Sequence, residues 1–315
     1  MADQTLENKL SLVCGHLAYS LGYSISHPCL SLQKRCQVNV FAKNYHLSPV
    51  SFLSELFHIK GRKLFHVWKG NSNYLIYITA YSLSFELIDD SFPTNLENDQ
   101  VSTLSILCPF YVTYLLDSIE SNLTSEGIDL KNYVKLSISR LAYLTSNCFS
   151  QLGMLTIVPT FVVYNTMHIT ITSLLNSLIQ KNTNQKKSKL FHEIVKNTAI
   201  TCLSSLFADF LLYPIETIMH RLMIQGTRCI IDNTENSVPY LIPIVSKYTG
   251  FLDCYNNILA NEGIAGFYRG LGGVFSRSIF LFFIARIAIN LALNVDFDNI
   301  GECNFDNFLK KFDLK

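Results

Sequence analysis

Charged residues are scarce in this sequence of 315 residues, and long stretches contain none at all. Asp, Glu, Lys and Arg together make up 16% of the chain, against about 25% in soluble globular domains. None of these four residue types occurs from Leu10 to Gln33 or from Leu141 to Gln180. A helix of roughly 20 residues crosses the ~30 Å hydrocarbon core of a bilayer. Both charge-free stretches are therefore long enough to span a membrane.

Four shorter segments are also poor in charge: 70–85, 100–116, 197–215 and 271–295. The six segments together predict an all-α membrane protein with six transmembrane helices. A large soluble protein with buried helices is the alternative, but soluble chains rarely bury six helices of this length. Ser, Thr, Asn and Tyr are mixed into the segments, which indicates helices packed around a polar interior.

The sequence lacks the residue patterns that several functional classes require. The net charge of +1 gives no basic field for a nucleic-acid partner. The nine cysteines contain no C-x-x-C pair, which favours reduced thiols over a disulfide framework. No phosphate-binding loop, H-E-x-x-H motif or nucleophile-base pair is present, so we expect no catalytic residue, metal site or cofactor and no enzymatic activity. His16, His27 and His168 lack ligand spacing and are predicted to be packed or hydrogen-bonded. The first ten residues contain no Arg, unlike a transit peptide.

Prolines mark an internal repeat. Pro28, Pro109 and Pro214 each lie within an apolar segment, and an arginine follows seven residues later in the first and third cases, as Arg35 and Arg221. A proline inside a helix removes one backbone hydrogen bond and kinks the helix. Three kinked helices of this kind can converge on a common axis.

A second element of the repeat is an aromatic-basic-glycine triplet, found at 68–70 and 268–270. The sequence therefore predicts three repeats, at 1–98, 99–188 and 189–295, followed by a polar tail at 296–315. Spans are expected near 10–38, 69–90, 99–122, 149–179, 189–225 and 270–295, with connecting helices near 48–58, 129–143 and 250–262. The third repeat is the best preserved and the second is the most degenerate.

The third repeat resembles the mitochondrial carrier family. Its matching positions are Pro214, Glu216, Arg221, Gln225, Gly250, Asp253, Glu262, Gly263, Gly266, Arg269 and Gly270. The resemblance implies the carrier fold, in which three pairs of transmembrane helices alternate with short amphipathic helices. Further stretches of the first and third repeats are similar to an outer-membrane branch of that family: 27–29, 36–39, 45–47, 221–228 and 231–234.

This branch implies a multi-pass protein of the mitochondrial outer membrane. It further implies a role in fission and fusion balance, cristae maintenance and lipid supply, exerted through protein contacts. The implied partners are membrane lipid and the proteins of mitochondrial fusion, fission and cristae organisation. The predicted spans contain no sharp G-x-x-x-G motif that would argue for a membrane dimer, so the sequence leaves the oligomeric state open.

A working carrier closes one side with acid-base pairs, one from each proline motif, which must meet and separate during alternating access. The corresponding positions here are Leu30 and Gln33, Tyr111 and Tyr114, and Glu216 and Met219. No motif keeps a pair, so we expect no ionic ring. Glu216 would be left as a lone buried charge, and we expect His220 or Arg221 to take it up.

The alternative is a solute or lipid transporter whose gate uses hydrogen bonds from Tyr111, Tyr114, Gln33 and Glu216. Glu216 and Arg221 are candidates for a substrate cavity, although structural contacts are the favoured interpretation. Arg277 and Arg286 are candidates for contact with a phosphate, and an interfacial position is favoured for both. Trp68 is expected in an aromatic belt at the membrane interface.

Overall fold

A computed structural model describes residues 2–40, 45–58, 68, 70–91, 96–119, 134–135, 138–139, 154–182, 190–224, 229–232, 240–243 and 248–294. Its longer helices are α1 (Ala2–Val38), α3 (Asn71–Ser91), α4 (Leu96–Ile119), α6 (Met154–Asn182), α7 (Leu190–Met223) and α10 (Leu271–Asn294). The shorter ones are α2 (Pro49–His58), α8 (Phe251–Glu262) and α9 (Ile264–Phe267). The long helices confirm helical structure at all six predicted segments, whereas the connecting helix expected at 129–143 lies almost entirely outside the described residues.

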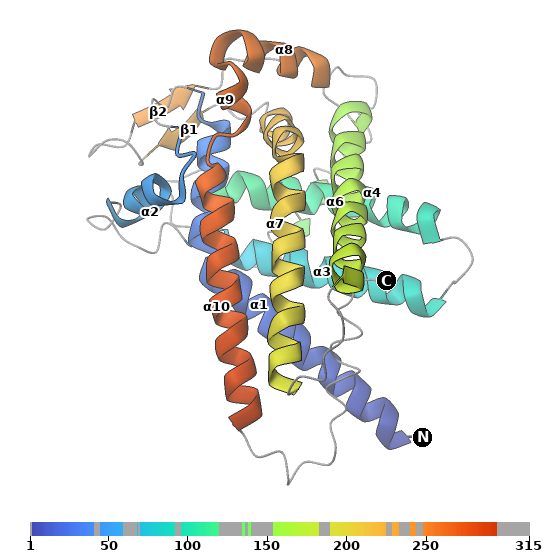
Figure 1. The fold of residues 1–315 in the computed structure, drawn as a ribbon. Helices are drawn as coiled ribbons and strands as arrows, with labels where there is room; N and C mark the ends of the chain where they lie inside the picture. The colour runs from blue at the N-terminus through green and yellow to red at the C-terminus, as the bar shows by residue number, and fades with distance from the viewer. Residues whose placement is uncertain are drawn as a thin grey trace.

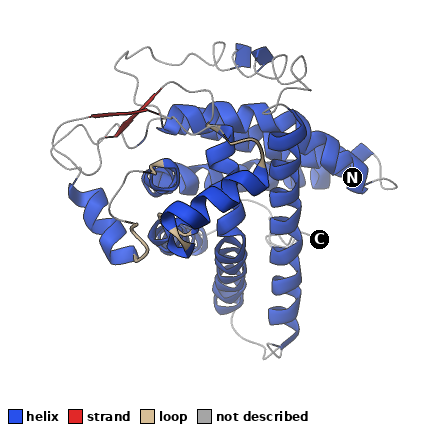
Figure 2. Ribbon diagram, turned by 90° about the horizontal axis from the view of Figure 1, so that it is seen from above, coloured by secondary structure: helices blue, strands red, loops and turns tan. Residues whose placement is uncertain are grey.

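The long helices pack in two directions. In Figure 1, α6, α7 and α10 run side by side, α3 and α4 cross behind them, and α8 lies over one end. Figure 2, which looks from above, shows the described residues as mostly helical, with two short strands. By length and composition, two segments among the described residues suffice to cross a membrane: Lys196–Met223 and Ile264–Ile287.

Several long helices turn large apolar side chains outward. Between 38% and 62% of the surface of each of these side chains is exposed: Leu21, Ile25, Val163, Met167, Leu174, Leu178, Leu203, Phe207, Phe210, Leu211, Ile279, Phe280, Phe283 and Ile287. Soluble monomers rarely expose contiguous apolar surface on this scale. The outward faces of α1, α6, α7 and α10 are therefore suited to contact lipid.

Hydroxyl residues are spaced along helix α6. These hydroxyls donate to carbonyl oxygens three or four residues earlier in the same helix, at 2.8–3.1 Å, from Thr160, Thr166, Thr170, Ser173 and Ser177. A polar group that is satisfied within its own helix does not need water. The composition of α6 is thus compatible with an apolar surrounding.

Two glycines with left-handed backbone conformations place the starts of α3 and α10. Gly70 has φ +84° and Gly270 has φ +78°. A Cβ atom on Gly270 would lie 2.9 Å from Cys36 Cβ, and one on Gly70 would lie 3.2 Å from Ser118 N. Only glycine combines this conformation with so close an approach, which explains the glycine of each aromatic-basic-glycine triplet.

The described residues are helical as predicted, apart from one short β-hairpin. Strands β1 (Cys229–Asp232) and β2 (Tyr240–Pro243) pair antiparallel between α7 and α8, with Ile230 opposite Ile242. Both strands are rich in β-branched or aromatic residues, which favour extended backbone. Sequence analysis treated this stretch only as part of a family resemblance and missed its local β propensity.

Candidate functional site

The six gate positions of the proline motifs lie inside the bundle. Leu30, Tyr114 and Met219 are at most 3% exposed and belong to one buried cluster, against which Tyr111 packs. Gln33 and Glu216 are also buried. Helices α1, α4 and α7 therefore do converge at their proline motifs, and the residues that meet there are mostly apolar or aromatic.

Glu216 is held by amide groups rather than by a cation of its own helix. Its carboxylate accepts from Gln33 Nε2 at 3.4 Å and from Gln37 Nε2 at 3.3 Å, both across the α1–α7 contact. The expectation that His220 or Arg221 takes up this charge is wrong. Helix α1 instead brings two glutamines to the carboxylate. They lie close to Glu216 in space although they are far from it in the sequence.

His220 instead joins a second set of hydrogen bonds. Its Nδ1 lies 2.6 Å from Gln37 Oε1, and its Nε2 lies 2.8 Å from the hydroxyl of Tyr111 on α4. His220 and Gln37 are fully buried. A chain of neutral polar groups therefore links α1, α4 and α7 where a carrier would have ion pairs.

Lys34 is a buried cation that sequence analysis missed. It is 2% exposed and lies one position after Gln33, which occupies the base position of the motif. Its Nζ lies 3.8 Å from the centre of the Tyr114 ring. Two features of the sequence could have revealed it. A basic residue directly follows the base position of the first motif, and tyrosines occupy both gate positions of the second motif.

The arginines that follow the prolines make equivalent contacts in two repeats. Arg35 donates its Nε to the carbonyl of Ser118 at 3.2 Å, and Arg221 donates its Nε to the carbonyl of Gln37 at 3.0 Å. Each arginine stands seven residues after its own proline, and each acceptor stands nine residues after the proline of another repeat. The arginine of the first repeat thus contacts the second repeat in the same way as the arginine of the third repeat contacts the first. This relation is expected of a three-fold repeat.

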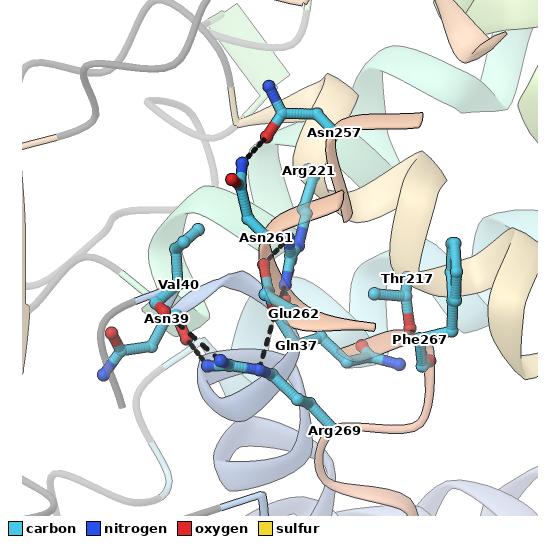
Figure 3. A network of polar contacts seen from close by, with 10 residues as sticks. All are labelled: Gln37, Asn39, Val40, Thr217, Arg221, Asn257, Asn261, Glu262, Phe267 and Arg269. Carbon is cyan, nitrogen blue, oxygen red and sulfur yellow. Dashed lines mark hydrogen bonds and ion pairs between the residues drawn. The ribbon is translucent and has the colours of Figure 1, made fainter. Parts of the chain in front are cut away.

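Arg221 also anchors α8 through the network drawn in Figure 3. Glu262 accepts from both terminal nitrogens of Arg221, at 2.5 and 2.9 Å, and lies 2.7 Å from Arg269 Nε. Arg269 reaches across to the carbonyls of Asn39 and Val40 beyond the end of α1. A single buried carboxylate therefore neutralises two buried arginines and ties α7, α8 and α1 together.

A second buried charge cluster lies deeper along α7. Asp209 accepts from Arg277 Nη2 at 2.5 Å, and its other oxygen lies 2.9 Å from His168 Nε2. The interfacial position favoured for Arg277 is wrong, because the side chain pairs with an acid inside the bundle. Arg286, by contrast, is exposed on α10, and His168 is hydrogen-bonded as expected.

Two further signature positions help to shape α8. The carboxylate of Asp253 accepts from the Thr249 backbone nitrogen at 2.9 Å, which ties the residue before the N-cap Gly250 to the first turn of the helix. Gly266 faces Glu262, where a Cβ atom would lie 2.5 Å from that residue's own Cβ. Gln225 lies outside the described residues, as do the loop at 183–189 and the tail after 294.

No group of three or more His, Cys, Asp or Glu residues in the described ranges is placed to hold a metal ion. The clusters instead pair each buried acid with arginines, amides or a histidine. Proline-containing helices that converge at their motifs and are joined by equivalent arginine contacts define a carrier-like helical bundle.

Comparison with known proteins agrees with this class. The family model of the mitochondrial carrier protein matches residues 191–290. "Mitochondrial outer membrane protein SLC25A46" of Homo sapiens is 31% identical over 284 residues, and that of Gallus gallus is 32% identical. "Solute carrier family 25 member 46" of Xenopus tropicalis is 33% identical over the same length. The alignments cover 79% of this chain and 66–68% of those relatives.

The chain belongs to the mitochondrial carrier family, in the branch of these relatives. It is a multi-pass protein of the mitochondrial outer membrane, the location that the names of the human and chicken relatives state.

Proposed function

We propose that this chain is a carrier-like scaffold of the mitochondrial outer membrane that acts through contacts with other proteins rather than by exchanging solutes. Its role would lie in the balance of fission and fusion, in cristae maintenance and in lipid supply. The observation that carries the proposal is the state of the gate, where buried amide, phenol and imidazole groups occupy the place of the ion pairs.

The physical reason concerns reversibility. Alternating access requires gate contacts that are made on one side while those of the other side are broken. The packing of Leu30, Tyr114 and Met219 in one buried cluster stabilises the closed arrangement. None of the three has a charge that could exchange an ion pair for a substrate contact. A gate of this composition favours one closed arrangement over two of similar free energy.

The proposed architecture is a bundle of six spans in three repeats, at 1–98, 99–188 and 189–295. The equivalent contacts of Arg35 and Arg221 support the repeat. The apolar outward faces of α1, α6, α7 and α10 support lipid exposure beyond the two helices that composition alone identifies. In this arrangement α8 lies at the membrane surface, over the end of the bundle (Figure 1).

Reconstitution into liposomes tests the scaffold proposal. The purified chain is inserted into vesicles loaded with a panel of metabolites and phospholipids, beside a known metabolite carrier prepared in the same way. We expect no saturable exchange from the chain and normal exchange from the control. Saturable exchange of any solute would contradict the proposal. Proximity labelling from the chain in living cells, compared with a ligase anchored alone in the outer membrane, should enrich fission, fusion and cristae-organising proteins.

A second candidate is a transporter with a non-ionic gate. The observation that favours it is that the contacts of Glu216 with Gln33 and of Tyr111 with His220 are hydrogen bonds between different helices, which can separate at a lower cost than buried ion pairs. The liposome assay decides between the two candidates, because only the transporter predicts exchange that is lost when Glu216 is replaced by Ala.

A further inference from the structure

The ammonium group of Lys34 is enclosed by tyrosines of two other helices. Its Nζ lies 3.8 Å from the ring centre of Tyr114, 4.9 Å from that of Tyr111 and 5.8 Å from that of Tyr74. The rings also contact one another, with 4.6 Å between the centres of Tyr74 and Tyr114. A cation within about 6 Å of an aromatic ring centre is attracted by the ring's negative face. Three rings around one ammonium form an aromatic cage.

The ammonium group is buried, and the tyrosine rings are the contacts that the structure gives it. Lys34 is 2% exposed. The buried acids of α7 have other partners: Glu216 accepts from Gln33 and Gln37, and Asp209 pairs with Arg277. Since a buried charge without a partner is strongly disfavoured, the charge of Lys34 depends on its aromatic cage.

This arrangement reaches all the helices that carry the proline motifs. Lys34 extends from α1, and its tyrosine cage comes from α3 and α4. The hydroxyl of Tyr111 in this cage lies 2.8 Å from His220 Nε2 on α7. The cage is therefore tied to α7 by a hydrogen bond.

We infer that Lys34 is a positioning residue that latches α1 to α3 and α4 through its tyrosine cage, at the place where a carrier would have its ring of ion pairs. The inference deepens the proposed function, on which it rests, by naming what holds the interior closed. The latch consists of Lys34, Tyr74, Tyr111 and Tyr114. A residue that merely fills space would need only the bulk of its side chain, whereas the latch needs a positive charge at the cage.

Chemical rescue distinguishes these roles. Lys34→Ala in the full chain, purified in lipid nanodiscs, leaves a space in the cage that matches n-propylammonium. We expect the variant to melt several degrees below the parent chain, and n-propylammonium chloride to restore at least half of that loss. Propan-1-ol, which has similar bulk but no charge, should restore little. Equal effects of the amine and the alcohol, or no effect of either, would overturn the inference.

A matched control removes bulk elsewhere on the same helix. Leu32 is 1% exposed and packs in a separate apolar cluster with Cys29 and Phe52. Leu32→Ala should also lower the melting temperature, but the amine should not restore it better than the alcohol. A preference for the amine in this variant as well would show a general salt effect and would overturn the assignment to Lys34.

A second measurement applies if Lys34→Ala does not fold. Lys34→Met keeps the length of the side chain without its charge, so the loss of melting temperature caused by Tyr114→Leu can be measured with and without the ammonium. We expect this loss to shrink by at least half in the Lys34→Met background. An unchanged loss would refute the latch. Solute exchange by the reconstituted chain would refute the scaffold proposal and leave the rescue result intact, so the two failures are separable.

Discussion

Glu262 offers the sharpest test of how the bundle is fastened at the α8 end. It neutralises Arg221 and Arg269, each only 2% exposed, and Glu262→Gln would leave both arginines without a counter-charge. Removing one partner of a buried ion pair costs about 3–5 kcal/mol. The loss should lie in this range because the guanidinium groups keep their carbonyl partners at Gln37 and Asn39.

The same geometry predicts an order among the variants. Arg221→Gln leaves Glu262 paired with Arg269, so no buried charge is left alone. The variant loses hydrogen bonds to Glu262 and Gln37 and should cost less than Glu262→Gln, about 2–3 kcal/mol. Asp253→Asn removes a carboxylate from the exposed face of the same helix and should cost under about 1 kcal/mol.

The free energy of unfolding of these three variants in mixed micelles provides the test. A Glu262→Gln variant within about 1 kcal/mol of the parent chain, or more stable than Arg221→Gln, would refute the two-arginine interpretation. Asp253→Asn serves as the control for a general effect of charge on α8.

Other contacts give independent predictions. Trp68 donates its Nε1 at 2.9 Å to the carbonyl of Ser24, which Pro28 leaves without a helical donor; Trp68→Phe should cost about 1 kcal/mol in the same unfolding assay. Gly270 and Gly263 both have positive φ, but only Gly270 has atoms within 3 Å of a new Cβ. Gly270→Ala should therefore cost more than the roughly 1 kcal/mol expected of Gly263→Ala, and equal losses would count against the close approach. Burial raises the pKa of the Cys254 thiol from 9.0 to about 12, which lowers its thiolate fraction at pH 8 about a thousandfold. Alkylation of this thiol, followed by mass spectrometry, should be slow in the parent chain and faster in Glu262→Gln, and rapid labelling of the parent chain would contradict its burial under α7.

The positions of the long helices were predictable because they follow from one strong constraint. A segment that lies in hydrocarbon has to exclude charge over its whole length, and that exclusion is visible in the sequence without any knowledge of contacts. The prolines and the aromatic-basic-glycine triplets added the proposed order of repeats. The hairpin at 229–243 was missed because two short strands produce a weak local signal beside helices of this length.

The partners of the buried charges could not be predicted in this way. Glu216 was expected to find a cation on its own helix, but its amide partners come from α1, 179 and 183 residues away in the sequence. Arg277 pairs with Asp209 across 68 residues. Local spacing restricts which residues share a face of a helix, whereas the relative rotation of two helices decides which faces meet. Lys34 shows most clearly how far local spacing can predict a contact. It stands one position after the base position of the motif, yet its long side chain still reaches the gate.

The proposed second repeat lacks the arginine that makes these contacts in the other two. Leu116 stands seven residues after Pro109, at the position of Arg35 and Arg221 in the other repeats, and it cannot donate to a carbonyl. The equivalent acceptor, nine residues after Pro214, is Met223. Leu116 and Met223 belong to the same buried apolar cluster. Apolar packing within this cluster therefore occupies the positions that correspond to the arginine and its acceptor in the other two contacts. A buried leucine and methionine at these positions bring no unpaired charge into the bundle.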